Sequence, residues 1–286
     1  GAEAYNVAIG SLAGNDITTG TNNTLIGGLA GDAITTSSYN TALGYSALTD
    51  STTGQKNTAV GRFAGANITT ANDNTVVGAD ALFTNTTGAS NTAIGMGALN
   101  GNTTSSNNTA VGYQAGYSNT TGTQISAFGY LALNEATTPN NNAAFGTQAM
   151  RRLTTGSENT AIGTEALRQS TTGSNNTAVG SASLILNTTG SNNVAHGYHA
   201  LFNNTTASDN TAVGYQALLA NTTGTANVAM GKSSLAVATT GDFNTAVGYQ
   251  TLDALTTADN NVAVGTSALG SNTTGASNIA IGKNAM

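Results

Sequence analysis

The sequence predicts an all-β fold, a parallel β-solenoid or β-roll in which one coil corresponds to one sequence repeat. Glycine recurs at every seventeenth position from Gly10 to Gly282 without an insertion or deletion, which gives seventeen copies of the repeat. Each copy has about five β-compatible residues, a Gly, a second short apolar segment and a Thr-Thr pair, and it lacks the apolar spacing of an amphipathic helix. An unbroken period stacks equivalent residues about 4.8 Å apart. We therefore expect about 17 coils with two short strands each, forming a column of roughly 80 Å.

Composition excludes several classes of protein. Only 7% of the residues are charged, so Asn, Thr, Ser and Gly must keep the chain soluble. Seven Lys and Arg against 13 Asp and Glu leave a net charge of −6 and no basic face, so we expect no nucleic-acid partner. The absence of Cys and the presence of only two His argue against a zinc site, and we expect no cofactor. No apolar run approaches the roughly 20 residues of a membrane span, so we expect no membrane-spanning segment.

The strand of the repeat has one broad and one thin face. Numbered from its Asn, the consensus is Asn-Thr-Ala-Val-Gly-Tyr-Gln-Ala-Leu-x-x-Asn-Thr-Thr-Gly-Ser-Asn, nearly complete over residues 210–226. Side chains alternate along a strand, so positions 2 and 4 share one face and the Ala of position 3 takes the other. The Ala row, broken only by Leu25 and Val76, indicates a surface that another backbone approaches closely. The Gly of position 5 indicates either a corner with positive φ or a further close approach.

Polar columns replace ion pairs in this repeat. Position 1 is Asn in every copy except the one with Ile125, and positions 13 and 14 are a Thr pair in every complete copy. Stacked amides and hydroxyls form hydrogen-bond ladders and satisfy the backbone of turns. We expect structural ladder positions of this kind at Asn108, Gly112, Thr120, Thr121, Gly129, Asn142 and Gly146.

The interior shows compensation between positions 9 and 12. Three copies that lose the Leu of position 9 to Gly gain an Ile at position 12, and the pairs are Gly14 with Ile17, Gly31 with Ile34 and Gly65 with Ile68. We expect the Ile side chain to fill the space that the Leu leaves. Gly116 has no such Ile, and we expect Tyr117 to fill its space.

The strand motif resembles the head repeats of trimeric autotransporter adhesins. Asn-Thr-Ala-Val-Gly at 108–112, Asn-Thr-Ala-Ile-Gly at 91–95 and Asn-Val-Ala-Ile-Gly at 6–10 carry the resemblance, and similar repeats occur in phage tail-fibre-like proteins. The resemblance implies a left-handed parallel β-roll, three chains side by side, and binding to host matrix or to other cells.

Several side-chain groups are candidate sites, each with a simpler structural role as the alternative. Tyr occupies position 6 in six copies, where stacked rings would either bind sugars or cover a seam; these residues are Tyr45, Tyr113, Tyr130, Tyr198, Tyr215 and Tyr249. Asp16, Asp32 and Asp50 lie on one edge, and Asp242 and Asp259 are one period apart; either group would hold a hard cation or form a solvated edge, and we favour the edge. His196 takes a position usually held by Val, and His199 follows three residues later. We favour a substitution within the core over a metal site for this pair. No nucleophile, base and orienting group occur together, so we expect no enzyme.

The Thr columns raise two further hypotheses. Adjacent Thr residues cannot share one strand face, so the repeat exposes one Thr row and not the two rows of an ice-binding T-x-T face. Asn-Thr-Thr is also a glycosylation sequon, and it occurs at Asn85, Asn102, Asn119, Asn187, Asn204, Asn221 and Asn272.

Together these patterns predict a structural protein. We expect a single domain over residues 1–286, uncapped at both ends, that acts as an extracellular fibre or adhesin shaft on a cell or virion surface. It would self-associate as a trimer or a head-to-tail filament and present Thr, Asn and Tyr columns to surface glycans or matrix, with avidity replacing a deep pocket. The alternatives are an ice-binding or carbohydrate-binding β-solenoid and, less favoured, a glycan-degrading tailspike enzyme.

Overall fold

The computed structural model describes residues 4–286 and contains only strands and turns there. Its seventeen strands each cover positions 2 to 4 of the repeat and recur once in every coil. In chain order they are β1 (Val7–Ile9), β2 (Thr24–Ile26), β3 (Thr41–Leu43), β4 (Thr58–Val60), β5 (Thr75–Val77), β6 (Thr92–Ile94), β7 (Thr109–Val111), β8 (Ser126–Phe128), β9 (Ala143–Phe145), β10 (Thr160–Ile162), β11 (Thr177–Val179), β12 (Val194–His196), β13 (Thr211–Val213), β14 (Val228–Met230), β15 (Thr245–Val247), β16 (Val262–Val264) and β17 (Ile279–Ile281).

The expected parallel β-solenoid is confirmed, with about 16 turns of about 17 residues. One detail is wrong: each coil has one strand and not two, because the second apolar segment is a series of turns. The chain divides into two compact units, one up to Asn142 and one from Ala143. The expectation of one domain over residues 1–286 stays a prediction, and its first three residues lie outside the described part.

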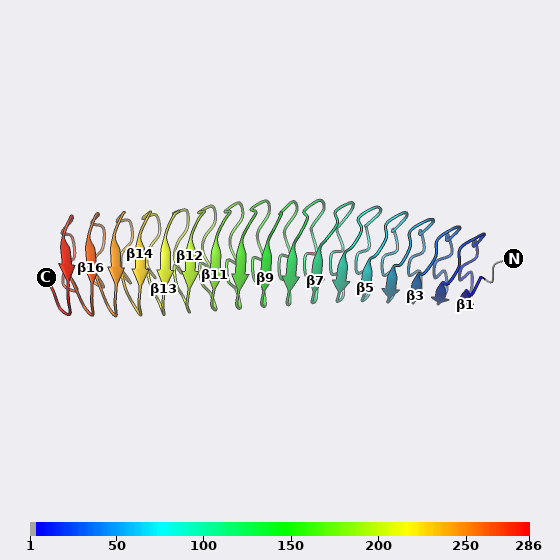
Figure 1. Cartoon of the computed structure of the whole chain (residues 1–286), viewed down its shortest axis with the longest axis horizontal. Coiled ribbons are helices and arrows are strands. Elements are labelled where there is room, and N and C mark those ends of the chain that lie inside the picture. The colour runs from blue at the N-terminus through cyan, green and yellow to red at the C-terminus, as the bar shows by residue number, and fades with distance from the viewer. Residues whose placement is uncertain (1–3) are drawn as a thin grey trace. The chain divides into compact units, whose positions relative to one another are not determined.

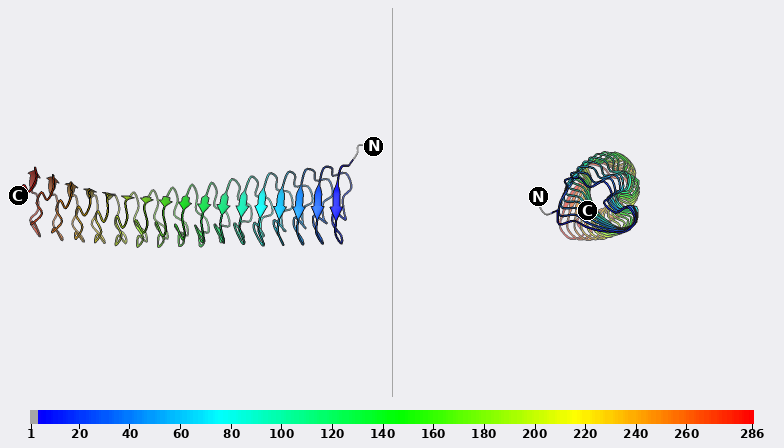
Figure 2. Two further views of the ribbon diagram at one scale, coloured as in Figure 1. Left: turned by 90° about the horizontal axis from the view of Figure 1, so that it is seen from below. Right: turned by 90° about the vertical axis from the view of Figure 1, so that its right-hand side faces the viewer.

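Within each unit, every strand pairs in parallel with the strand one repeat away. In the first unit β1 to β8 pair in chain order, and in the second β9 to β17 do the same, as Figures 1 and 2 show. The register is one full repeat throughout, for example Val111 opposite Phe128. Gly112 and Gly129 are therefore axial neighbours, as the period requires.

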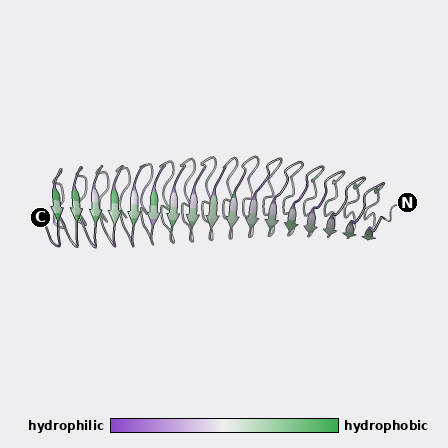
Figure 3. Ribbon diagram, viewed as in Figure 1, coloured by the Kyte–Doolittle hydropathy of each residue, from purple (hydrophilic) through white to green (hydrophobic). Residues whose placement is uncertain are grey.

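The thin face of the strand points inward. The position-3 side chains from Leu25 to Ala280 are buried in every strand from β2 to β17, whereas positions 2 and 4 are half-buried or exposed. Hydrophobic residues gather on the strands, among them β16 and β17 near the C-terminus (Figure 3). The interior space opposite the strand is taken by the Leu of position 9 and the Ala of position 8, of which Leu99 and Ala98 are fully buried. Little space is left for the side chain of position 3, which accounts for the Ala row. The larger Leu25 extends into the space beside Gly14 and Gly31, which lack the Leu of position 9, and Val76 is the second exception.

The Gly of position 5 serves both as a corner and as a close approach. Its φ lies between 125° and 142° in every copy, a region that L residues rarely adopt. At Gly112 an added Cβ would also lie 2.7 Å from the carbonyl carbon of Gly129 in the next coil. A corner with positive φ and a close approach of another backbone, the two alternatives that the sequence left open, therefore both apply to the same Gly.

The Ile compensation is confirmed, and the space beside Gly116 is filled differently from the expectation. A Cβ added at Gly31 would lie 2.7 Å from Cδ1 of Ile34, so the Ile occupies the space of the missing Leu. Beside Gly116 the nearest side-chain atoms belong to Leu99, at 3.0 Å, and to Ile125, at 3.5 Å. Ile125, the residue that interrupts the Asn column, fills this space, while Tyr117 lies outside with 36% of its surface exposed.

Candidate binding surfaces

The Asn residues of position 1 form a buried hydrogen-bond ladder. Asn57 donates its backbone N–H to Oδ1 of Asn40 at 2.9 Å, and Nδ2 of Asn57 donates to the carbonyl of Ala71 at 2.8 Å. The pattern repeats along both units, and Asn108 belongs to it. Asn142 is also buried, and its Nδ2 donates to the carbonyl of Asn140 at 3.0 Å. At the interruption Ile125 still donates its N–H to Oδ1 of Asn108, at 3.1 Å. The ladder is therefore internal structure and offers nothing to a ligand.

A second buried Asn row occupies position 12, and it overturns the glycosylation hypothesis for six residues. Asn85, Asn102, Asn119, Asn187, Asn204 and Asn221 have no exposed surface. In the coil of Asn204, for example, Nδ2 donates to Oδ1 of Asn187 at 3.0 Å and to the carbonyl of Ala207 at 3.0 Å. A glycan on such a nitrogen would remove these bonds and has no space inside the coil. Asn272 is half-buried, and its Nδ2 is bonded to the carbonyl of Gly275.

The two Thr columns differ in exposure. Position 13 is an internal ladder in which each hydroxyl donates to the carbonyl of the same position in the next coil, as Thr120 does to Thr137 at 2.9 Å. Position 14 is exposed in every coil from Thr19 to Thr274, Thr121 included. Of the two adjacent Thr columns, only that of position 14 is exposed in every coil, and both columns lie in bends outside the strands, where the alternation of a strand does not apply.

The Tyr column lies outside the coils, with its six rings between 40% and 52% exposed. Tyr113 and Tyr130 stack with their centroids 5.4 Å apart, and Tyr198 and Tyr215 stack at 5.6 Å. The Nζ of Lys232 lies over the ring of Tyr215, at 5.6 Å from its centroid. Tyr45 instead meets Phe63 edge to face, at 5.6 Å.

The outward side chains of positions 2 and 4, named here the strand face, form a neutral and largely apolar surface on each unit. The most exposed large position-4 residues away from the chain ends are Leu43, Ile94, Phe145, Ile162, Met230 and Val264, at 36% to 45%. His196 belongs to this exposed row, so its assignment to the core is wrong, because position 4 points outward. His199 stacks on Tyr198 with ring centroids 3.7 Å apart, and partial burial lowers the pKa of its imidazole.

The candidate carboxylates have structural partners. Oδ1 of Asp242 accepts the backbone N–H of Thr225 at 2.6 Å, and Asp259 accepts that of Asp242 at 2.8 Å, so both belong to a ladder at position 16. Asp32 accepts a hydrogen bond from Thr49 Oγ1 at 2.5 Å. Burial, reinforced by the neighbouring charge of Asp32, raises the pKa of Asp50. Among residues 4–286 no three acidic or His side chains gather as a metal site would require.

The first unit has a pocket that the sequence did not predict, named here the Gly97 pocket. It has a volume of about 400 Å³ and is lined by residues of positions 6, 7 and 10 in four successive coils. Its apolar lining comes from Phe63, Phe83, Met96 and Tyr117, and its polar lining from Asp80, Asn100 and Gln114. One signal in the sequence marks it: Gly97 is the only Gly in the column of position 7.

Comparison with known proteins assigns no family. No protein-family model matches the chain, and no curated protein or solved structure is significantly similar to it. The part of the chain that the structure describes contains no helix with the length and apolar character of a membrane span. The class that the fold defines is therefore a parallel β-solenoid repeat protein.

Proposed function

We propose that the protein is an extracellular structural fibre or adhesin shaft that self-associates through its strand face. The observation that carries the proposal is the exposure of an aliphatic and aromatic row on strands whose inward residues are Ala. Contiguous exposed apolar surface is uncommon on monomeric proteins and typically marks an interaction site. The extracellular location rests on the resemblance of the strand motif to adhesin head repeats.

A second copy of the chain is the occupant that best fits this face. The strand face carries no Lys, Arg, Asp or Glu at positions 2 and 4, so two copies meet without charge repulsion. Its rows also recur with one period, so the spacing of one copy matches that of another coil by coil. The number of chains in the assembly is expected to be three, as the resemblance implies.

Attachment to a surface would use the rows that stay outside the assembly. The Thr row of position 14 and the Tyr column are exposed on each unit. The Asn rows of positions 1 and 12 are buried, so these Asn side chains do not contribute to surface attachment. Repetition of one weak contact along a row raises the overall affinity without a deep pocket. The mechanism is therefore interfacial, and it calls for no catalytic group.

The test replaces the strand face in three coils of the second unit. In the triple variant Ile162→Asp, Met230→Asp and Val264→Asp, the new charges would have to be buried in the assembly, which is costly. We expect the wild type to sediment as an oligomer and this variant as a monomer in analytical ultracentrifugation. Electron micrographs of the wild type give the width of the assembly and hence the number of chains.

The matched control places the same three charges on the exposed Thr row of the same coils. Thr172→Asp, Thr240→Asp and Thr274→Asp change net charge equally but leave the strand face intact. This control is expected to keep the oligomer. A wild-type protein that stays monomeric at every concentration, or a strand-face variant that associates as the wild type does, would contradict the proposal.

A further inference from the structure

The Gly97 pocket lies at the one position of a regular column that carries no side chain. Position 7 lies on the outside of the coil in a left-handed conformation, and its neighbours Asp80 and Gln114 adopt φ of 55° and 49° with full side chains. Gly97 has the same conformation, with φ of 67°. A Cβ added there would meet only side-chain atoms of Gln114 and Tyr117, at 3.3 Å, so backbone packing does not require Gly at this position. The side chains of Gln114 and Tyr117 cover the buried Gly97 and line the pocket together with it.

Aromatic side chains form the walls of this opening. Phe83 and Tyr117 occupy position 10 two coils apart, with Asn100 between them in the same column. Phe63 meets Phe83 edge to face, with centroids 6.0 Å apart, and the guanidinium of Arg62 lies 4.9 Å from the centre of the Phe63 ring. Ring contacts on both sides of Phe63 hold it in place, and the pocket is consequently walled before any ligand binds.

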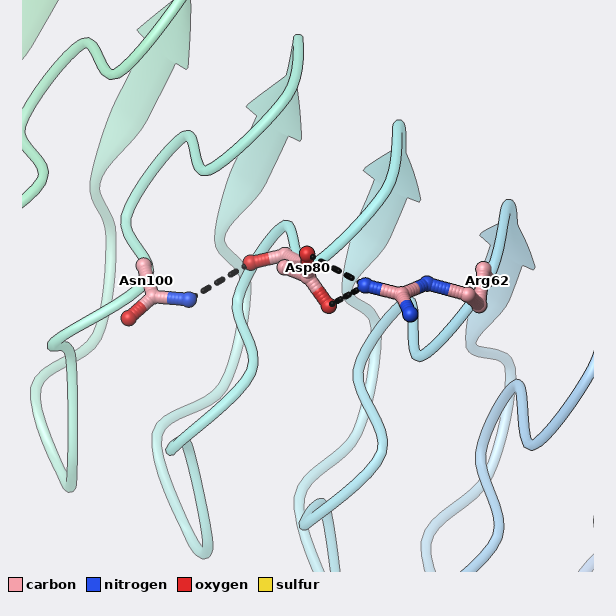
Figure 4. A network of polar contacts seen from close by, with 3 residues as sticks. All are labelled: Arg62, Asp80 and Asn100. Carbon is pink, nitrogen blue, oxygen red and sulfur yellow. Dashed lines mark hydrogen bonds and ion pairs between the residues drawn. The ribbon is translucent and has the colours of Figure 1, made fainter.

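Polar groups at the pocket are held in fixed positions by one another. Figure 4 shows that Nδ2 of Asn100 donates to the backbone carbonyl of Asp80, at 2.8 Å, while Arg62 donates to both carboxylate oxygens of Asp80, at 3.1 and 3.3 Å. This contact orients the Asn100 amide and leaves its Oδ1 without a hydrogen bond among residues 4–286. The side-chain amide of Gln114 also makes no hydrogen bond within that range. Acceptors and donors are therefore available beside the aromatic walls.

We propose that the Gly97 pocket binds a sugar ring of a neutral oligosaccharide. A pyranose has an apolar C–H face, which packs on aromatic rings, and hydroxyl groups, which exchange hydrogen bonds with carboxylate and amide groups. Phe83 and Tyr117 supply the first kind of contact, and Asp80, Asn100 and Gln114 the second. The volume of about 400 Å³ lies in the range of small-ligand sites.

The local charges favour a neutral ligand. The carboxylate of Asp80 is paired with the guanidinium of Arg62, so the two charges compensate each other and select neither an anion nor a cation. The lining of the pocket also spans four coils that rise about 4.8 Å each, so neighbouring sugars of a chain would continue along the stacking direction. This proposal does not depend on self-association, because the pocket lies on positions 6, 7 and 10 and not on the strand face.

The test fills the pocket with the side chain that the column carries elsewhere. Gln148, Gln216 and Gln250 occupy position 7 with φ between 51° and 57°, so Gly97→Gln is compatible with the fold. The probes are an array of neutral hexose and N-acetylhexosamine oligosaccharides beside acidic ones, followed by titration calorimetry with the neutral tetrasaccharide that binds best. We expect wild-type binding to a neutral oligosaccharide and at least a tenfold loss of affinity in Gly97→Gln and in Tyr117→Ala.

Two control variants distinguish this pocket from the Tyr column and from a general effect of substitution. Ser233→Gln makes the same kind of change at position 7 of a coil in the second unit, and Tyr249→Ala removes a ring from the Tyr column. Both are expected to bind as the wild type does, with unchanged circular dichroism for all four variants. The proposal is overturned if the wild type binds no neutral oligosaccharide, if it prefers the acidic ones, or if Gly97→Gln binds as tightly as the wild type. Loss of binding in Tyr249→Ala with retention in Gly97→Gln would overturn it in favour of the Tyr column.

Discussion

Replacing Gly112 by Ala tests the closest contact between coils. The φ of Gly112 is 137°, and an added Cβ would lie 2.7 Å from the carbonyl carbon of Gly129. The coils would have to move apart at this point. Two backbone hydrogen bonds beside Gly112 hold these two coils together, from the N–H of Gly129 to the carbonyl of Val111 at 2.8 Å and from the N–H of Leu131 to the carbonyl of Tyr113 at 3.0 Å.

The expected cost follows from these two effects. A non-Gly residue in such a region of φ costs about 1–3 kcal/mol, and weakening two hydrogen bonds costs about 1 kcal/mol each, so Gly112→Ala is expected to lose about 3–5 kcal/mol of unfolding free energy. Gly97→Ala is the matched control, because its φ is also positive but its Cβ meets side chains only. It is expected to lose about 1–2 kcal/mol.

The assay combines urea unfolding, followed by far-ultraviolet circular dichroism, with hydrogen exchange. Repeat arrays open coil by coil when one interface is weakened, so exchange reports the damage locally. Amides in the coils of Gly112 and Gly129 are expected to exchange faster in Gly112→Ala, and those near the ends of the first unit to change little. If Gly112→Ala is as stable as Gly97→Ala, the close approach of the coils carries no energetic weight and the argument from it is refuted.

Three further predictions concern the interior and one edge. Asn193→Ala is expected to lower the unfolding free energy by at least about 3 kcal/mol, because it leaves buried hydrogen-bond donors and acceptors without partners on both sides of the ladder. The control is Thr206→Ala at an exposed position, and equal urea midpoints for the two variants would contradict a stabilising role of the ladder. Leu218→Ala is expected to cost about 2–5 kcal/mol in the same assay, since this side chain is fully buried; a cost below about 1 kcal/mol would show that the coil collapses around it. The pKa of Asp50 is raised in the folded state, so the folded protein binds this proton more tightly than the unfolded chain does. The contribution of Asp50 to the unfolding free energy is therefore full below its unfolded pKa and is lost as the pH rises through its folded pKa. Asp50→Asn removes this loss, so its stability relative to the wild type is expected to increase from pH 3 to pH 7 in thermal unfolding scans, and a constant difference would refute the assignment.

The candidate sites show how far reasoning from the sequence reached. The Tyr column and the Thr column of position 14 lie on the outside at positions that recur once per coil, because each column depends only on which residues recur. Thr121, expected in a structural ladder, lies in the exposed column instead. The burial of the sequon Asn residues and the exposure of His196 were not foreseen. The exposure of these residues depends on whether a side chain at a corner or on a strand points into the coil or out of it. The repeat period does not determine that direction.

The Gly97 pocket was beyond the sequence for a related reason. The pocket is lined by side chains from several coils, and Phe83 and Tyr117 of position 10 lie beside Gly97 of position 7 in it. No spacing rule for helices or strands describes that juxtaposition, since both positions lie in consecutive turns.

The sequence by itself determined the solenoid, the length of its coil, the register of the strands and the need for Gly at position 5, because an unbroken repeat leaves only one way to stack equivalent residues. Only the tertiary structure decided which strand face is inside, that each coil has one strand, and that Leu of position 9 adopts a left-handed φ of 48–52°. The physical reason is space: a coil this short encloses little volume, and the Leu side chains occupy it. The larger residues of the strand are thereby left on the outside, although they are the more hydrophobic ones.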